Sequence, residues 1–124
     1  MLSGFDLVTL VGVVDMARAR RFYGDVLGLP VAEESPFAVV VDVHGRMLRL
    51  TAVEEPAAAP YSVLAWSVDD IGTVVDGLAG RGVEFARYEG MEQDDRGIWT
   101  APGGARIAWF LDPDRNNLSL VQFA

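Results

Sequence analysis

The chain has 124 residues, which is the usual size of one domain, and 51% of them are hydrophobic, enough to build a core. Its net charge of −8 comes from 18 acidic residues against 10 arginines, with no lysine. This balance argues against nucleic acids and anionic membrane surfaces as partners. The absence of cysteine excludes disulfides and thiolate metal sites, and the absence of lysine excludes Schiff-base chemistry.

The sequence contains no run of about 18 apolar residues and does not open with a charged segment followed by an apolar one. We therefore expect a cytoplasmic protein. The single histidine, His44, lies in a predicted hairpin turn, where a solvated side chain is the usual outcome. With one histidine and no cysteine, most zinc sites and most histidine-activated nucleophiles are excluded.

The first half of the chain predicts one strand, one amphipathic helix and three further strands. Asp15 has the residue type of a helix N-cap, and Gly28, followed by Pro30, marks the end of the helix. The proline- and alanine-rich stretch 54–60 is typical of a linker. The predicted elements are a strand at 5–14, a helix at 16–27, and strands at 30–34, 37–43 and 46–53.

The second half repeats this order. Asp69 or Asp70 is expected to cap a second amphipathic helix, which Gly80 and Gly82 end. An acidic loop at 89–96 and the turns 102–104 and 112–116 separate the later elements. The predicted elements are a strand at 61–68, a helix from 71 to 79, a short strand at 83–88, and strands at 97–100, 105–111 and 117–123.

The order βαβββ therefore occurs twice, which indicates a duplicated module. We expect an α+β fold, a single domain over 1–124 made of module one at about 1–57 and module two at about 58–124. Each module leaves a sheet with one face covered by a helix and one bare face. Two such sheets are expected to form a curled mixed sheet that encloses a cavity between the bare faces.

Three stretches in this order, 19–29, 65–70 and 112–116, resemble the vicinal oxygen chelate superfamily, which includes glyoxalase I, extradiol dioxygenases and bleomycin-resistance proteins. The resemblance covers nearly the whole chain. One departure is Arg115, where the family usually has a glycine in the turn. Asn116 or Asn117 is therefore expected to supply the left-handed residue.

The resemblance implies a divalent metal held by histidine and glutamate side chains from both modules, with one position open for a substrate oxygen. The corresponding positions here are Val8, Arg49, Val63 and Ser119. Valine cannot ligate a metal, arginine repels it and a lone serine is a poor ligand. We therefore expect no metal and no other cofactor.

Strand alternation places the same positions on the faces that the resemblance assigns to the cavity. Arg49 is the sharpest feature, because among apolar neighbours it either receives an anionic or carbonyl-bearing ligand or pairs with an internal carboxylate. Trp66 alternates out of phase with Val63 and is therefore expected to pack under the helix. Trp99 is expected to line the pocket. The predicted ligand-binding residues are Arg49, Ser119, Val8, Val63, Leu10, Met47, Thr51 and Trp99.

Two functions are compatible with this pattern. The first is a metal-independent small-molecule-binding protein of the bleomycin-resistance type. The alternative is a glyoxalase-like lyase, isomerase or dioxygenase, metal-free or with a metal at another position. The predicted cavity faces offer no general base, so the enzyme alternative requires Asp42, Glu54 or Glu89 to point inward. The resemblance also implies a homodimer.

Overall fold

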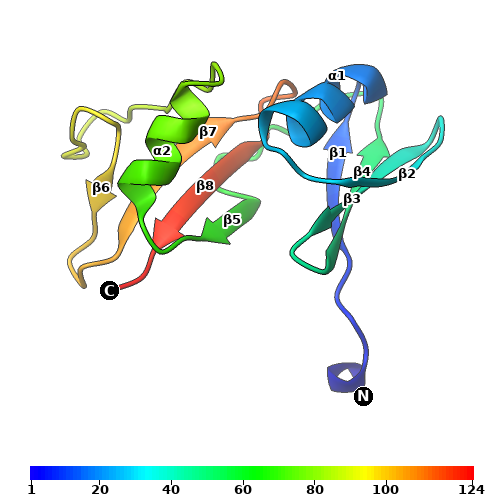
Figure 1. Cartoon of the computed structure of the whole chain (residues 1–124), viewed down its shortest axis with the longest axis horizontal. Helices are drawn as coiled ribbons and strands as arrows, with labels where there is room; N and C mark the ends of the chain where they lie inside the picture. Colours follow the sequence, from blue (N-terminus) through cyan, green and yellow to red (C-terminus); the bar gives the residue numbers. More distant parts are fainter. The chain divides into compact units, whose positions relative to one another are not determined.

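The computed structural model describes all of residues 1–124, and these form two compact units, Met1–Ala57 (unit 1) and Ala58–Ala124 (unit 2). Each unit contains one four-stranded sheet and a helical segment between its first two strands (Figure 1). This confirms the predicted α+β class and the two modules. Neither unit contains a helix with the length and hydropathy needed to cross a membrane.

The sheet of unit 1 has the strand order β1-β4-β3-β2. Strand β1 runs parallel to β4, and the other neighbours are antiparallel. His44 and Gly45 form the two-residue turn between β3 and β4, and both have positive φ, at 52° and 84°, as a type I′ hairpin requires. The elements are β1 (Thr9–Val13), α1 (Met16–Arg20), a π-helical turn (Arg21–Val26), β2 (Val31–Glu34), β3 (Ala38–Val43) and β4 (Arg46–Ala52).

The first strand is shorter than predicted, because the stretch 5–8 has no partner strand. The parallel register begins at Thr9, opposite Leu48. Upstream, Phe5 and Leu7 are 71% and 86% exposed, and a short 3-10 helix covers Leu2–Gly4. The apolar residues before Thr9 gave the sequence the composition of a strand, but they are not part of the sheet.

The first helix begins as predicted and then changes its winding. The Asp15 carboxylate accepts the backbone N–H of Arg18 at 3.0 Å and so caps α1. Beyond Arg20 the chain forms a π-helical turn, in which the Leu27 N–H donates to the Phe22 carbonyl five residues earlier. Gly28, at φ 75°, adopts the left-handed conformation directly after this turn, as expected of a helix-ending glycine.

The core of unit 1 lies between this helical segment and one face of the sheet. Alternate residues of β1, β3 and β4 point to that face, and Ala19 and Tyr23 meet them from the helical side. Burial of these apolar side chains is the main contribution to the stability of the unit. The buried sheet residues on this face are Val11, Val13, Val39, Val41, Leu48 and Leu50.

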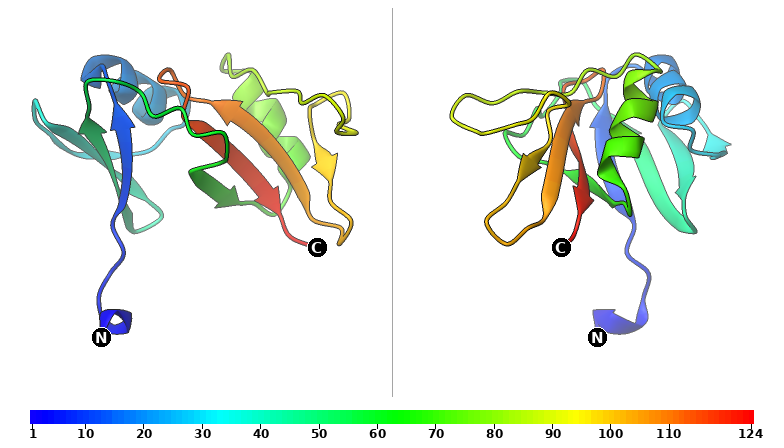
Figure 2. Two further views of the ribbon diagram at one scale, coloured as in Figure 1. Left: turned by 180° about the vertical axis from the view of Figure 1, so that it is seen from behind. Right: turned by 60° about the vertical axis from the view of Figure 1, so that its left-hand side comes forward.

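The sheet of unit 2 has the strand order β5-β8-β7-β6, with β5 parallel to β8. The two units therefore share one topology. Helix α2 packs against β7 and β8 and presents the buried side chains Ile71 and Val75 (Figures 1 and 2). The elements are β5 (Leu64–Ser67), α2 (Ile71–Ala79), β6 (Trp99–Thr100), β7 (Arg106–Leu111) and β8 (Asn117–Gln122).

For unit 2, one sequence-based expectation is confirmed and narrowed, and another is wrong. Of the two candidate caps, it is Asp70 that accepts the Thr73 N–H at 3.2 Å. The predicted strand at 83–88 is wrong, because only an isolated bridge between Phe85 and Phe110 forms there. The segment that follows is held by side-chain hydrogen bonds from Gln93, so its backbone groups are satisfied without a strand ladder.

Candidate ligand-binding faces

In unit 1, the predicted site residues lie on the sheet face opposite the helical segment. The parallel register places Leu10 beside Arg49 and Gly12 beside Thr51. Val8 and Met47 lie further toward the start of β1, and both are about half exposed. There the stretches 6–9 and 45–47 line a groove of about 620 Å³ that contains one acidic and one basic side chain, Asp6 and Arg46.

Arg49 is half-buried on this face, with Leu10 and Val40 as its register partners on the two neighbouring strands. Within unit 1 its guanidinium makes no hydrogen bond or ion pair. No carboxylate of this unit therefore neutralises it. Asp42, the register partner of Met47, shares this face without forming an ion pair with Arg49, so the guanidinium keeps its five N–H donors for a carboxylate or carbonyl oxygen.

A second polar group without a partner lies on the same face. The Thr51 hydroxyl oxygen is buried and has no hydrogen-bond partner. Its register partner is Gly12, and a Cβ added at Gly12 would come within 3.1 Å of Val53. Gly12 therefore allows the backbone of β1 to lie close to Val53. Arg49 and Thr51, on the same face, are both available for a ligand.

In unit 2, Ser119 lies on the face opposite α2, between Ala65 on β5 and Trp109 on β7. It is only 3% exposed, and its hydroxyl is 2.8 Å from the hydroxyl of Ser62. Ser62 donates its single proton to the Leu64 carbonyl at 2.7 Å. Ser119 must therefore be the donor to Ser62, which leaves the Ser119 oxygen as a hydrogen-bond acceptor.

Three aromatic side chains, Tyr88, Trp99 and Trp109, form a continuous cluster on this face. The ring centroids of Trp99 and Trp109 are 6.1 Å apart, and those of Tyr88 and Trp109 are 5.5 Å apart. Asn117 donates to the Tyr88 hydroxyl at 3.1 Å. Sequence analysis singled out Trp99 but missed Tyr88 and Asn117, although Asn117 lies two residues before Ser119 and thus shares its side of the strand.

Trp66 lies on the other side of the sheet, as predicted from its phase. It is the register partner of Leu120 and stacks on Phe110 with ring centroids 6.5 Å apart. Both partners belong to the buried core beneath α2. The three tryptophans of the chain therefore divide into one on the helix-covered side of the sheet and two on the opposite face.

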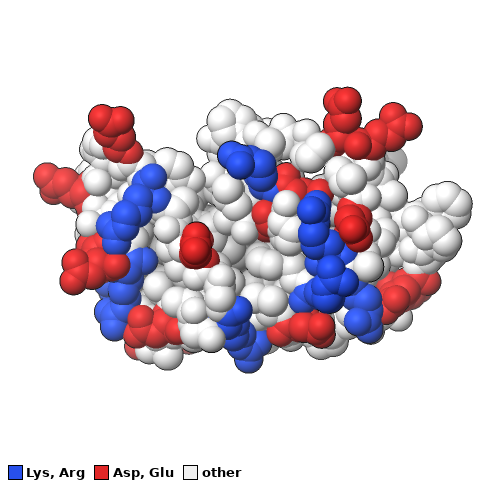
Figure 3. All heavy atoms as spheres, turned by 90° about the horizontal axis from the view of Figure 1, so that it is seen from above, with Lys and Arg blue, Asp and Glu red and all other residues white.

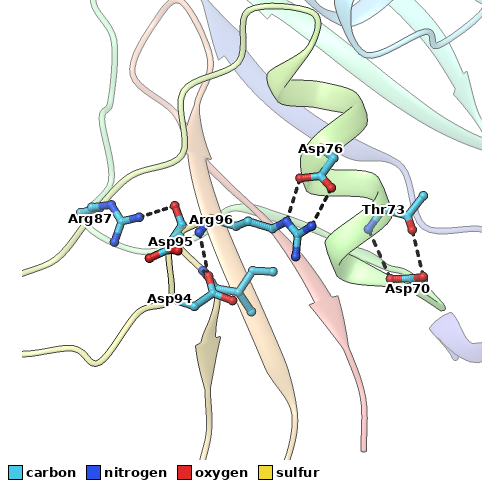
Figure 4. A network of polar contacts seen from close by, with 8 residues as sticks. Asp70, Thr73, Asp76, Arg87, Asp94, Asp95 and Arg96 are labelled. Carbon is cyan, nitrogen blue, oxygen red and sulfur yellow. Dashed lines mark hydrogen bonds and ion pairs between the residues drawn. The ribbon is translucent and has the colours of Figure 1, made fainter.

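The acidic loop of unit 2 is a fixed part of the structure (Figure 4). Arg96 binds both carboxylate oxygens of Asp76 on α2, at 2.8 and 2.9 Å, and this pairing raises the pKa of Arg96. Asp94 accepts the N–H groups of Arg96 and Ile98, and Arg87 donates to the Asp95 carbonyl at 2.7 Å. These carboxylates therefore have structural partners.

Charged side chains elsewhere are also mixed in sign. Figure 3 shows arginine groups next to acidic groups over the face that it presents. The three candidates for a general base, Asp42, Glu54 and Glu89, are all exposed. Asp42 is the register partner of Met47 and therefore lies on the same sheet face as Arg49, as the enzyme alternative requires of a base in unit 1.

The residues at the four metal-ligand positions do not fit a divalent metal. Val8 and Val63 have no donor atom, Arg49 is a cation, and the Ser119 hydroxyl is bonded to Ser62. No group of three or more His, Asp or Glu side chains lies close enough to hold a metal ion. These four positions therefore lack the nitrogen and oxygen donors that a divalent metal requires.

Comparisons with known proteins agree with this fold. The family model described as "Glyoxalase/Bleomycin resistance protein/Dioxygenase superfamily" matches residues 5–120. No curated protein matches the sequence.

Solved structures with the same fold have low sequence identity to the chain. A putative glyoxalase family protein from Bacillus anthracis aligns with a TM-score of 0.74 and 16% identity, over 100% of this chain and 98% of that one. A glyoxalase / bleomycin resistance protein from Catenulispora acidiphila gives 0.70 and 25%, over 97% and 99%. A lactoylglutathione lyase from Agrobacterium tumefaciens gives 0.71 and 19%, over 98% and 96%, a likeness that shows the fold alone.

Proposed function

Because the chain belongs to the glyoxalase/bleomycin resistance protein/dioxygenase superfamily but carries no donor set for its metal, we propose that it binds an organic small molecule without a metal. We propose a ligand-binding face in each unit, on the side of its sheet opposite the helix. Arg49, Thr51, Leu10, Val8 and Met47 contribute from unit 1, and Ser119, Val63 and Trp99 contribute from unit 2. We further propose a cytoplasmic homodimer, by resemblance to the family.

The observation that carries this proposal is Arg49. Arg49 lies half-buried beside Leu10 and Val40 and makes no ion pair within unit 1, which leaves it open to a ligand that compensates its charge. A carboxylate or carbonyl oxygen would do so through short, charge-assisted hydrogen bonds. Apolar neighbours then supply contact area, and Thr51 supplies a hydroxyl nearby. Binding and sequestration need only this arrangement, whereas turnover would also need a positioned base.

The proposal is tested by native mass spectrometry of the purified protein, combined with metal analysis. We expect a bound organic molecule that carries a carboxylate or carbonyl group, and no stoichiometric metal. Stoichiometric nickel, zinc, iron or manganese would contradict the proposal, and so would the absence of any retained or titratable organic ligand.

Substitution of Arg49 sharpens the test. Arg49→Met should weaken the ligand identified in this way by about 10- to 100-fold, which is the usual contribution of hydrogen bonds to a charged group. Arg106→Met, on the helix side of β7, is the matched control and should leave affinity unchanged. Circular dichroism should show both variants folded; an Arg49→Met chain that unfolds would show a structural role instead.

A further inference from the structure

The aromatic cluster of unit 2 has the composition of a recognition surface for a ring. Tyr88 is 37% exposed and Trp99 and Trp109 are half-buried, so the three rings present area to solvent. Trp109 links the other two rings, at 5.5 Å from Tyr88 and 6.1 Å from Trp99. We call these three residues the aromatic face. The Trp109 ring is tilted by 36° from the Trp99 ring and nearly perpendicular to the Tyr88 ring, at 86°, so a planar group that stacks on an indole can meet the Tyr88 ring at its edge.

The polar atoms beside the aromatic face are hydrogen-bond acceptors. Ser119 uses its proton on Ser62, so its oxygen has only lone pairs to offer. Asn117 is 8% exposed, and its carbonyl oxygen has no hydrogen-bond partner. Its amide nitrogen is bonded to Tyr88, so a ring that inserts beside Tyr88 approaches this oxygen. A buried acceptor without a partner is costly, and a donor on the ligand removes that cost.

The strand positions on this side of unit 2 carry no charged side chain. On β5, β7 and β8 they are occupied by apolar residues, serines, an asparagine and Trp109. The chain as a whole has a net charge of −8, which favours the approach of cations over anions. Indole and phenol faces also attract cations through the ring quadrupole.

From these observations we propose that the aromatic face binds a planar, nitrogen-containing aromatic group that is cationic or carries N–H donors. An indole of the aromatic face stacks on the group, the Tyr88 ring contacts its edge, and the oxygens of Asn117 and Ser119 accept its N–H hydrogens. This inference rests on the proposed function and defines the class of ligand that unit 2 selects.

The three tryptophans allow a direct test. The probe is proflavine, a planar tricyclic cation with amino N–H groups, and the matched probe is 9-anthracenecarboxylate, a planar tricyclic anion. Tryptophan fluorescence is titrated with each probe in a Trp66→Phe variant, which keeps the aromatic face, and in a Trp99→Phe/Trp109→Phe variant, whose only tryptophan lies on the helix-covered side of the sheet. We expect saturable quenching by proflavine in the first variant and none in the second.

Affinity is measured independently by the fluorescence polarisation of proflavine. Trp109→Leu and Tyr88→Leu should each weaken binding by about tenfold, which is a typical contribution of one stacked or cation–π contact. Phe37→Leu, an exposed aromatic residue of unit 1, is the control and should leave binding unchanged. Circular dichroism of each variant shows that a loss of binding is not a loss of fold.

Three outcomes would overturn the inference: no saturable proflavine binding, equal quenching of Trp66, or tighter binding of 9-anthracenecarboxylate than of proflavine when both are measured by tryptophan quenching in a Trp66→Phe/Arg49→Met variant. The proposed function is judged separately. A retained carboxylate ligand that depends on Arg49, with no proflavine binding, would leave the proposed function standing and reject the aromatic face as its ligand-selecting part.

Discussion

Units 1 and 2 share one strand order but differ on the sheet face away from the helix. Unit 1 presents aliphatic side chains such as Leu10 and Met47 together with the charged residues Arg49 and Asp42. Unit 2 presents an aromatic cluster around Trp109, with Ser119 buried beside it. The helix-covered faces are alike, since both are apolar and closely packed. The topology therefore depends on the helix-covered face, and the opposite face is free to acquire different chemistry in each module.

The hairpin turns differ in the same way. In unit 1 the exposed pair His44-Gly45 closes the turn through backbone conformation alone. In unit 2 the turn between β7 and β8 is buried and is held by the side chain of Asp112, which accepts the N–H groups of Asp114 and Asn116, both at 2.8 Å. Unit 2 therefore relies more on specific polar contacts, and this difference can be tested by removing them.

The largest effect is expected at Asp112. Asp112→Ala removes the acceptor of two backbone N–H groups and of the Asn116 side-chain amide, and it leaves them inside the protein. We expect a loss of about 3 kcal/mol in the free energy of unfolding. Asp112→Asn keeps one acceptor oxygen and should lose about half as much. Urea denaturation measures both; equal losses would mean that the charge, and not the hydrogen bonds, holds the turn.

A smaller effect is expected in the loop that replaces the predicted strand of unit 2. Gln93 accepts the Tyr88 N–H and donates to the carbonyls of Ala86 and Gly97. Gln93→Ala should lower the free energy of unfolding by about 2 kcal/mol. Gln93→Glu keeps the side-chain shape and the acceptor oxygen but loses the N–H donors. It should therefore lower the free energy of unfolding by as much as Gln93→Ala or by less. Hydrogen exchange should accelerate within 86–98 only; protection that stays unchanged there would show that the loop is held by other contacts.

A stabilising change is expected where each unit strains its backbone. Arg115 has φ 66° and His44 has φ 52°, a left-handed conformation that asparagine tolerates better than either residue. Arg115→Asn and His44→Asn should each raise the free energy of unfolding by about 0.5–1 kcal/mol. If only His44→Asn stabilises the protein, Arg115 makes contacts in the turn of unit 2 that offset its strain.

Arg115 also shows where sequence reasoning reached its limit. The turn was recognisable from its Asp-Pro-Asp sequence, but the left-handed residue was expected at Asn116 or Asn117, and that expectation was wrong. Both asparagines are buried, and Asn116 is bonded to Asp112, so neither was available for the left-handed position. Local propensity predicts which residue prefers a conformation, whereas tertiary hydrogen bonds decide which residue must adopt it.

The elements themselves followed from periodicity, because amphipathic helices and alternating strands depend on local sequence. The exceptions are two stretches of strand composition that form no strand. A strand needs a neighbouring strand to pair with, and the sequence does not show whether one is present. The stretch 5–8 has strand composition without a neighbouring strand, and 83–88 meets β7 only at Phe85. On the candidate faces, alternation correctly grouped Leu10 with Arg49. Strand alternation did not identify Tyr88, because Tyr88 lies outside a regular strand and its side-chain direction cannot be predicted from the alternation.

The smallest effect is expected at the two helix caps. Both caps are aspartates, and the comparison tests whether the two modules stabilise these aspartates in the same way. The pKa values of Asp15 and Asp70 are both below the ordinary 3.8. For Asp15 the main cause is the Arg18 N–H, and for Asp70 it is the Thr73 hydroxyl, followed by the Thr73 N–H. A lowered native pKa means that each cap stabilises the fold above about pH 4 and loses this effect as the pH falls through the native value.

Thr73→Val removes the hydroxyl that donates to Asp70 at 2.9 Å and keeps the backbone N–H. The pKa of Asp70 should therefore rise toward 3.8 while that of Asp15 stays unchanged, as measured by carbon-13 NMR titration of the side-chain carboxyls. The acid side of the stability curve should shift to slightly higher pH, because Asp70 then protonates earlier in the native state. A pKa of Asp70 that does not move would show that the backbone N–H alone lowers it, and the two caps would then work in the same way.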